Sequence, residues 1–335
     1  MTTIFFATNR NPNRKQAPTD FGSTFSSEGL DELRFGSGEV PEDPNGKIEV
    51  NTATERVADR PPSRQRLGSR SIFHQIWSEM ATHERDTMLY VHGFDFTFHD
   101  ALRRTAELKR WYDTGKEMNW IVFTWPSDGR KTPVKSYRSD RKDAEASGTA
   151  MGRGMLKAAD FIRDLQRDQY CRQRIHLLAH SMGNYALRYA VQGMRSFVGS
   201  ELPRVFDEVL LMAADADNDA LTHGDKLAPL ERLAKRVTTY YNSQDLALVV
   251  SDWTKLNPDR LGSSGPRDLD HLPPKFIQVN CSAAIDWSAD PTGHQYYRNN
   301  DPVRQDVLAV LSLQEADQIQ YRKPISDRRQ TYRLG

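Results

Sequence analysis

The sequence predicts an α/β fold with a mostly parallel central sheet and helices on both faces. Between residues 71 and 315, short continuous apolar runs alternate with amphipathic helical patterns. Strands without polar alternation are typical of parallel sheets, which are covered on both faces. The length of 335 residues suits one large α/β domain. Ligands of such sheets gather at the carboxyl ends of the strands, so we expect the functional site there.

The first 70 residues carry a strand pattern and then little periodicity. Thr2 to Ala7 is apolar enough for a strand, whereas residues 9–70 are rich in Pro, Gly, Ser and charge, with Lys47 to Val50 as a further candidate strand. We therefore expect residues 1–70 to form an N-terminal strand and an irregular polar extension that packs on the same domain.

The core is predicted over residues 71–315. Apolar residues at helical spacing predict a first helix from Ser71 to Glu84. Further helices are predicted at His99–Tyr112, around Met155–Leu165, at Tyr185–Met194 and around Val303–Leu311. Strands are predicted at Thr87–Val91, Trp120–Trp125, Ile175–Ala179, Val209–Ala213, Val237–Tyr241 and Phe276–Val279.

Two polar segments remain outside these elements. Residues 127–148 are basic and follow a strand that ends near the expected site, so they form either a lid or insertion that binds an anionic substrate or a solvated surface loop. Residues 316–335 are charged and are expected to form a polar, peripheral C-terminal tail.

Composition excludes several function classes. The net charge of +1, with mixed signs, gives no reason to expect a nucleic-acid partner. The apolar run after Thr3 is too short for a secretory segment or stable membrane insertion, which favours the cytoplasm. Cys171 and Cys281 are too few for a disulfide framework or a thiolate zinc site, and no cofactor is expected. The oligomeric state is not predictable from these features.

Ser181 is the strongest candidate nucleophile. It lies directly between a predicted strand and a predicted helix, within Ala179-His180-Ser181-Met182-Gly183. This is a variant of the G-x-S-x-G elbow, in which small residues let strand and helix approach around a strained turn that exposes the hydroxyl. The alternative is a serine that merely caps the following helix.

A serine nucleophile needs a histidine base and an orienting acid, and both should follow it at later strand ends. His294 is preferred as the base because it follows the last predicted core strand, whereas His223 lies in a polar loop and His271 precedes that strand. Asp245, just past the strand Val237–Tyr241, is preferred as the acid, with Asp217 as the main alternative.

The acidic cluster of Asp215, Asp217 and Asp219 also mimics the start of a calcium loop. Ala220 and Lys226 stand where that loop requires glycine and glutamate, so the calcium interpretation fails.

The oxyanion hole is predicted to consist of two backbone N–H groups. Met182 follows the nucleophile, and Phe94 follows the glycine of the His92-Gly93-Phe94 turn. His92 and His99 do not have a common zinc spacing, so no metal site is predicted. Residues near the strand ends are candidates for the substrate pocket: Gly93, Trp125, His180 and Tyr296.

With these motifs assembled, the chain resembles an α/β-hydrolase. More narrowly, it is similar to a bacterial esterase/lipase-like branch described as a domain of unknown function, through IFFATNR (residues 4–10), LRFGSGEVPED (33–43), LLAHSMGN (177–184) and GHQYY (293–297). The resemblance covers roughly residues 3–312. It implies Ser181, Asp245 and His294 as a triad, and Phe94 and Met182 as the oxyanion hole.

The expected activity is cleavage of a small-molecule carboxylic ester through an acyl-enzyme, without a cofactor. A thioesterase, lipase or amidase would use the same machinery. A non-catalytic α/β-hydrolase-fold binding protein is the alternative from another class, although such proteins usually lack one triad member.

Overall fold

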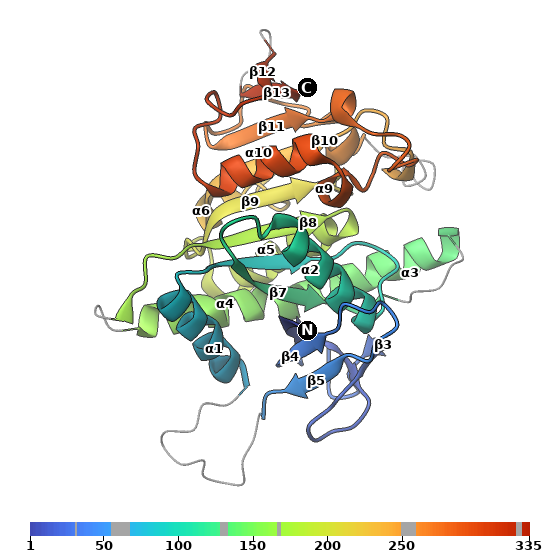
Figure 1. The fold of residues 1–335 in the computed structure, drawn as a ribbon, viewed down its shortest axis with the longest axis vertical. Helices are drawn as coiled ribbons and strands as arrows, with labels where there is room; N and C mark the ends of the chain where they lie inside the picture. Colours follow the sequence, from blue (N-terminus) through green and yellow to red (C-terminus); the bar gives the residue numbers. More distant parts are fainter. Residues whose placement is uncertain (31, 55–67, 128–132, 166–168, 249–258, 326–329) are drawn as a thin grey trace.

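The computed structural model describes residues 1–30, 32–54, 68–127, 133–165, 169–248, 259–325 and 330–335 (Figure 1). An eleven-stranded sheet forms its centre, in the order β12-β13-β11-β10-β9-β8-β6-β7-β1-β4-β5. From β13 to β1 in this order, neighbouring strands are parallel, and only the outer strands β12, β4 and β5 are antiparallel to their neighbours. The predicted mostly parallel sheet is therefore confirmed.

The parallel strands have the bounds β1 Thr2–Thr8, β6 Asp86–Val91, β7 Met118–Thr124, β8 Ile175–His180, β9 Phe206–Met212, β10 Ala234–Tyr241, β11 Phe276–Asn280 and β13 Thr331–Leu334. The antiparallel strands are β4 Arg34–Val40, β5 Glu49–Thr52 and β12 Arg322–Pro324. A separate hairpin consists of β2 Arg10–Pro12 and β3 Phe21–Phe25. The strands predicted in the core all form, with ends shifted by a few residues.

Helices cover both faces of the sheet, as predicted. One face is covered by α1 Gly68–His83, α4 Gly148–Asp164 and α5 Met182–Val198, and the other by α2 Phe98–Tyr112 and α10 Asp301–Leu311 (Figure 1). The further helix α3 comprises Pro133–Ala146. The short helical turns are α6 Leu230–Leu233, α8 Leu261–Ser264, α9 Tyr296–Asn299 and the 3₁₀ turn η2 Ser282–Ala284. Within the described residues, no helix has the length and apolarity that a membrane crossing requires.

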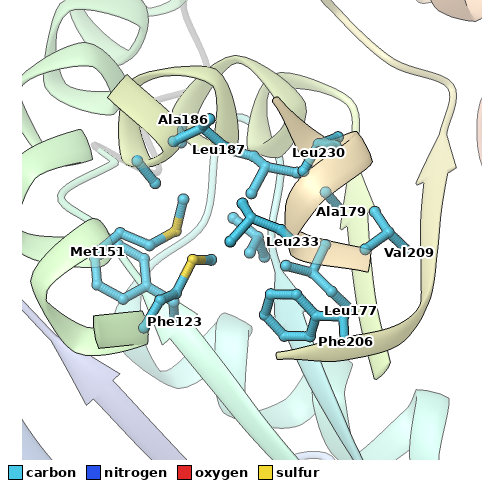
Figure 2. Packing of buried hydrophobic residues seen from close by; sticks show 14 of the residues in the cluster. Phe123, Met151, Leu177, Ala179, Ala186, Leu187, Phe206, Val209, Leu230 and Leu233 are labelled. Atoms are coloured by element: carbon cyan, nitrogen blue, oxygen red, sulfur yellow. The ribbon is translucent and has the colours of Figure 1, made fainter. Parts of the chain in front are cut away.

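The strand side chains alternate between two apolar layers. Leu177 and Val209 pack with Met151 of α4 and Leu187 of α5 in one layer (Figure 2). Leu178 and Leu210 face the layer under α2 and α10. Burial of each such side chain stabilises the fold by about 1.5–3 kcal/mol, so continuous apolar strands are the expected consequence of a sheet with two covered faces.

The prediction of an irregular polar extension over residues 1–70 was wrong for a large part of that segment. β4 pairs with β1 from Thr2–Val40 to Thr8–Arg34, and β5 extends the same sheet. The sequence RFGSGEV of β4 has little apolar alternation, and the strand is held by backbone pairing with β1 on one side and β5 on the other.

The prediction of a peripheral tail over residues 316–335 was also wrong. β13 pairs in parallel with β11, and Leu334 is fully buried. Arg322 of β12 donates two hydrogen bonds of 2.7 Å to the buried carboxylate of Asp306 in α10. At least one of the charged side chains that suggested a solvated tail, Arg322, is therefore buried inside the protein.

Candidate active site

Ser181 lies on a sharp turn between β8 and α5. Its φ of 54° and ψ of −125° are an unusual backbone conformation for a residue other than glycine. The turn is fixed on both sides, because the Ser181 N–H donates to Met212 O over 3.0 Å and the Asp215 N–H donates to Ser181 O over 3.1 Å. The Ser181 hydroxyl lines a cleft and has no hydrogen-bond partner among the described residues. A strained turn therefore presents an unengaged hydroxyl.

The elbow requires a small residue two positions after the serine. A Cβ atom at Gly183 would lie 2.4 Å from Val91 O and 2.6 Å from His92 O. The first turn of α5 therefore packs against the backbone at the end of β6, which also brings the His92-Gly93-Phe94 turn next to Ser181. The glycine in the predicted elbow has a steric explanation.

Asn184 also stabilises the elbow, although the sequence analysis assigned it no role. Its fully buried amide group lies within hydrogen-bond distance of Ala179 O (3.0 Å), Ser181 O (3.1 Å) and Met212 O (3.3 Å). The ends of β8 and β9 are thereby joined directly under the serine. The only available signal was its place at the end of LLAHSMGN.

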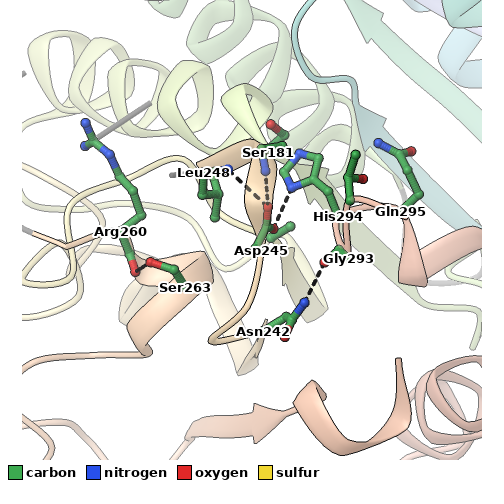
Figure 3. Close-up of polar contacts among 12 residues, drawn as sticks. Ser181, Asn242, Asp245, Leu248, Arg260, Ser263, Gly293, His294 and Gln295 are labelled. Atoms are coloured by element: carbon green, nitrogen blue, oxygen red, sulfur yellow. Dashed lines mark hydrogen bonds and ion pairs between the residues drawn. The ribbon is translucent and has the colours of Figure 1, made fainter. Parts of the chain in front are cut away.

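Asp245 and His294 are in direct contact at the neighbouring strand ends. The His294 Nδ1–H donates to Asp245 Oδ2 over 2.6 Å, and the imidazole lies next to Ser181 (Figure 3). The other oxygen, Asp245 Oδ1, accepts from the N–H groups of Ala247 (3.0 Å) and Leu248 (3.1 Å). Although burial disfavours the charged imidazole, the Asp245 carboxylate, together with Asp215 and Asp290, raises the pKa of His294 above its ordinary value of 6.5.

The loop that carries His294 is fixed by Asn242, a second residue that the sequence analysis did not assign. Asn242 Nδ2 donates to Gly293 O over 2.8 Å (Figure 3). Gly293 has a φ of 63°, and a Cβ atom there would lie 2.5 Å from Asn242 Nδ2. Glycine is needed at this position both for its backbone conformation and for space, and the contact sets the direction from which His294 enters the cleft.

The rival histidines lie elsewhere in the structure. The side chains of His223 and His271 are 56% and 79% exposed, and each contacts a nearby aspartate on the surface. Asp217, the rival acid, forms ion pairs with Arg260 (2.7 Å), Lys226 (3.1 Å) and Arg188 (3.5 Å), and not with a histidine. Of the predicted alternatives, the structure therefore brings only Asp245 and His294 together.

Asp215 is a further carboxylate beside the serine. It lies on the cleft wall, is almost fully buried, and accepts a 2.5 Å hydrogen bond from Tyr137 of α3. Arg141 of the same helix lies 3.6 Å from it. Part of the predicted lid region, residues 133–148, is thus a helix and the start of the next one, packed beside the cleft, whereas residues 128–132 lie outside the described part of the chain.

Phe94 and Met182 follow the ends of β6 and β8. Met182 is the first residue of α5, so its N–H has no acceptor within the helix. No acceptor for the Phe94 N–H occurs among the described residues either, whereas the next two N–H groups are engaged, by Asp140 at 3.2 Å and by the Ser127 hydroxyl at 3.1 Å. Phe94 lines the cleft, whereas Met182 is fully buried and is not part of the cleft lining.

The cleft has a volume of about 700 Å³ and a mixed lining. Its walls are formed by Phe94, Asp95, Phe96, Asp100, Arg103, Arg104, Glu107, Tyr137, His180, Ser181, Asp215, Ala247, Leu248, Thr292, His294, Gln295 and Arg298. This volume suits a small organic ligand, with apolar walls near the serine and charged groups around them.

Only one of the four predicted pocket residues lines this cleft. His180 does, and burial together with the nearby His294 keeps its pKa well below 6.5. Trp125 and Tyr296 are buried behind the site, so their assignment to the pocket was wrong. Trp125 stacks on His92, and the Tyr296 hydroxyl is held between the Ala213 N–H and Tyr240 O.

Gly93 is also behind the cleft wall rather than part of it. A Cβ atom at this position would approach Ser181 Cβ to 3.1 Å, so glycine is required for close packing of the two turns. His92 is buried between aromatic rings, and burial, assisted by the charge of Arg10, lowers its pKa to about 3. In the described residues, no group of three or more His, Cys, Asp or Glu side chains could hold a metal ion.

Two solved structures share a distant similarity with this chain. Among solved structures, lipase B from Aspergillus fumigatus shares 10% identity over 68% of this chain and 52% of its own, with a TM-score of 0.37. Phospholipase PlaB from Legionella pneumophila, in complex with thio-NAD, shares 15% identity over 58% of this chain and 37% of its own, with a TM-score of 0.25. The chain thus spans about half or less of these proteins.

No curated protein matches the chain. Residues 70–310, however, match a protein family over most of the sequence, and this match confirms the predicted α/β-hydrolase fold and the resemblance to a domain of unknown function. The chain belongs to the family described as alpha/beta hydrolase of unknown function (DUF900).

Proposed function

We propose that the protein is a serine hydrolase that cleaves carboxylic esters through an acyl-enzyme. The observation that carries the proposal is the buried His294–Asp245 hydrogen bond of 2.6 Å in the same cleft as the strained Ser181 turn. A nucleophile, a base and an orienting carboxylate are the minimal set for acyl transfer. Membership of the α/β-hydrolase family supports the same reaction type.

In the proposed reaction, His294 Nε2 accepts the Ser181 proton while Oγ bonds to the acyl carbon. Because Nδ1 donates to Asp245, Nε2 is the nitrogen left to act as a base. The carboxylate stabilises the imidazolium that forms. The N–H groups of Phe94 and Met182 would stabilise the oxyanion of the tetrahedral intermediate, each by about 3 kcal/mol.

Collapse of that intermediate breaks the bond to the leaving oxygen, which takes its proton from His294. Water then attacks the acyl-enzyme with His294 again as the base, and Ser181 is regenerated. The apolar wall formed by Phe94, Ala247 and Leu248 would accommodate the acyl chain. The proposed substrate is therefore a small acyl ester, and no step requires a metal or organic cofactor.

Labelling with a fluorophosphonate probe tests the proposal. The wild type should be labelled and should hydrolyse short p-nitrophenyl esters, whereas Ser181→Ala should lose both properties. Ser263→Ala is a matched control, since this hydroxyl donates only to Arg260 O within its own turn. A folded wild type that neither reacts with the probe nor hydrolyses any ester of the series would refute the proposal.

A further inference from the structure

The N-terminal segment supplies a buried arginine to the loop that forms one wall of the cleft. Arg10 follows β1, outside the family match of residues 70–310, and is only 1% exposed. Its guanidinium donates to Phe96 O over 2.7 Å, to Thr124 Oγ1 over 2.9 Å and to Ser127 O over 3.3 Å. One side chain thus connects the turn after β6 with the end of β7.

Several backbone groups of the turn formed by residues 93–96 are engaged in hydrogen bonds. Gly93 O is hydrogen-bonded to His92 Nδ1 over 2.8 Å, and the N–H groups of Asp95 and Phe96 are both engaged. Asp95 has a φ of 64°, a conformation that persists only where the surroundings impose it. In a trans peptide the N–H points opposite to the C=O, so fixing Gly93 O also fixes the direction of the Phe94 N–H.

Arg10 also acts on this peptide through a second route. Thr124 Oγ1 accepts from Arg10 Nε and lies 3.2 Å from His92 Nε2. Since the hydroxyl already accepts from Arg10, its own proton is directed to His92 Nε2. The Trp125 N–H also donates to that nitrogen over 3.3 Å. Nε2 is therefore an acceptor, and the proton of the neutral ring is on Nδ1, where it donates to Gly93 O.

We propose that Arg10 is a positioning residue of the active site, which aims the Phe94 N–H at the substrate oxyanion through its contacts with Phe96 O and Thr124. The inference rests on the proposed function, because it assigns a part of the oxyanion hole. It also makes the N-terminal segment, through Arg10 at the start of β2, a component of the active site that lies outside the family match.

The test compares Arg10→Met and Arg10→Lys with the wild type. Misplacement of one oxyanion donor should lower kcat about 100-fold for Arg10→Met, with KM changed by less than about threefold. Arg10→Lys keeps the charge but reaches fewer acceptors, so its kcat should be intermediate. The control is Arg322→Met, since Arg322 is also buried but lies in β12, at the far edge of the sheet, and the folded variant should keep the wild-type kcat.

Hydrogen exchange provides a readout that does not depend on activity. The N–H groups of Asp95 and Phe96 should exchange about tenfold faster in Arg10→Met than in the wild type, if the loop depends on the arginine. Unchanged kcat and unchanged exchange in Arg10→Met would overturn the inference. If the wild type itself were inactive towards the probe and esters, the proposed function would fail. In that case, unchanged exchange would overturn the loop contact as well, whereas faster exchange would support the contact.

Discussion

His294 donates a 2.6 Å hydrogen bond to Asp245, and the bond joins the loops that follow β10 and β11 at the same edge of the sheet. The two residues are 49 positions apart in the chain, yet both are almost fully buried. A carboxylate whose remaining oxygen accepts two backbone N–H groups has its orientation fixed. The imidazole orientation is therefore fixed as well, which is the property that a general base requires.

The pH profile should depend on this pair. The folded-state pKa of His294 is raised above 6.5, so its charged form is favoured and the base is inactive at low pH. We expect kcat/KM to rise with pH through an inflection above 6.5. In Asp245→Asn the burial effect remains without the carboxylate, so the inflection should move to lower pH and kcat should fall by about 10⁴-fold.

Asp217→Asn is the matched control for that measurement. Asp217 pairs with arginine and lysine side chains rather than with His294, so its loss should leave the inflection in place. A profile that shifts equally in both variants would contradict the assignment of Asp245 as the orienting acid.

Gly183→Ala should disrupt the elbow. The added Cβ would meet two backbone oxygens at 2.4 and 2.6 Å, and these atoms belong to the end of β6 and cannot move independently. We expect a loss of about 1–3 kcal/mol or more in the free energy of unfolding, as for overpacked sites, and loss of probe labelling. Chemical denaturation measures the first quantity.

Gly154→Ala provides the comparison, because a Cβ there would meet only side-chain carbons at 3.8 and 4.0 Å within α4. Replacement of a helical glycine by alanine at an open position should stabilise the protein by about 0.5–1 kcal/mol. Equal destabilisation by both substitutions would show that the steric argument at Gly183 is incorrect.

Asn242→Ala should loosen the loop that carries His294. Gly293 O loses its side-chain partner, and an unsatisfied buried carbonyl costs about 1–3 kcal/mol. We also expect kcat for a p-nitrophenyl ester to fall by about tenfold to a hundredfold, since small displacements of a base reduce the rate strongly. Asn13→Ala, at an exposed turn, should change stability by less than about 0.5 kcal/mol and leave kcat unchanged.

Arg322→Met should separate stability from activity. Removal of one partner from the buried Arg322–Asp306 pair leaves an uncompensated carboxylate, at a cost of about 3–5 kcal/mol. Since β12 is at the opposite edge of the sheet from β1 and β4, kcat of the folded protein should not change. Thermal unfolding and steady-state rates measure the two effects, and a fall in kcat at full folding would contradict this separation.

The sequence was sufficient for the central strands and their helices because each depends on local periodicity. Ile175–His180 is a mostly apolar run, and a strand of this kind is stable where both faces of the sheet are covered. The elbow could also be recognised from local sequence, because Ser181 and the small residues Ala179 and Gly183 lie within five consecutive positions. His294 and Asp245 could be preferred over their rivals from their position relative to strand ends, but Asp217 remained an alternative acid.

The strands at and next to the two edges of the sheet were harder to recognise. β4, β12 and β13 are short or poor in apolar alternation and were not predicted, whereas β5 overlaps the candidate strand Lys47 to Val50. These strands form because a neighbouring strand offers unpaired backbone groups. Trp125 and Tyr296 were placed in the pocket from their proximity to strand ends. Their side chains instead point behind the site, and no periodicity determines that direction after a strand has ended.

The sequence by itself determined the type of sheet and the identity of the exposed serine, because both follow from contacts between neighbours in the chain. Only the tertiary structure decided which acid meets His294, which residues form the cleft, and that Arg10 contacts the turn at Phe96, 86 positions away. These contacts depend on how loops from separate strands meet at one edge of the sheet. Their geometry is a property of the packed molecule, since each is held by hydrogen bonds to residues far apart in sequence.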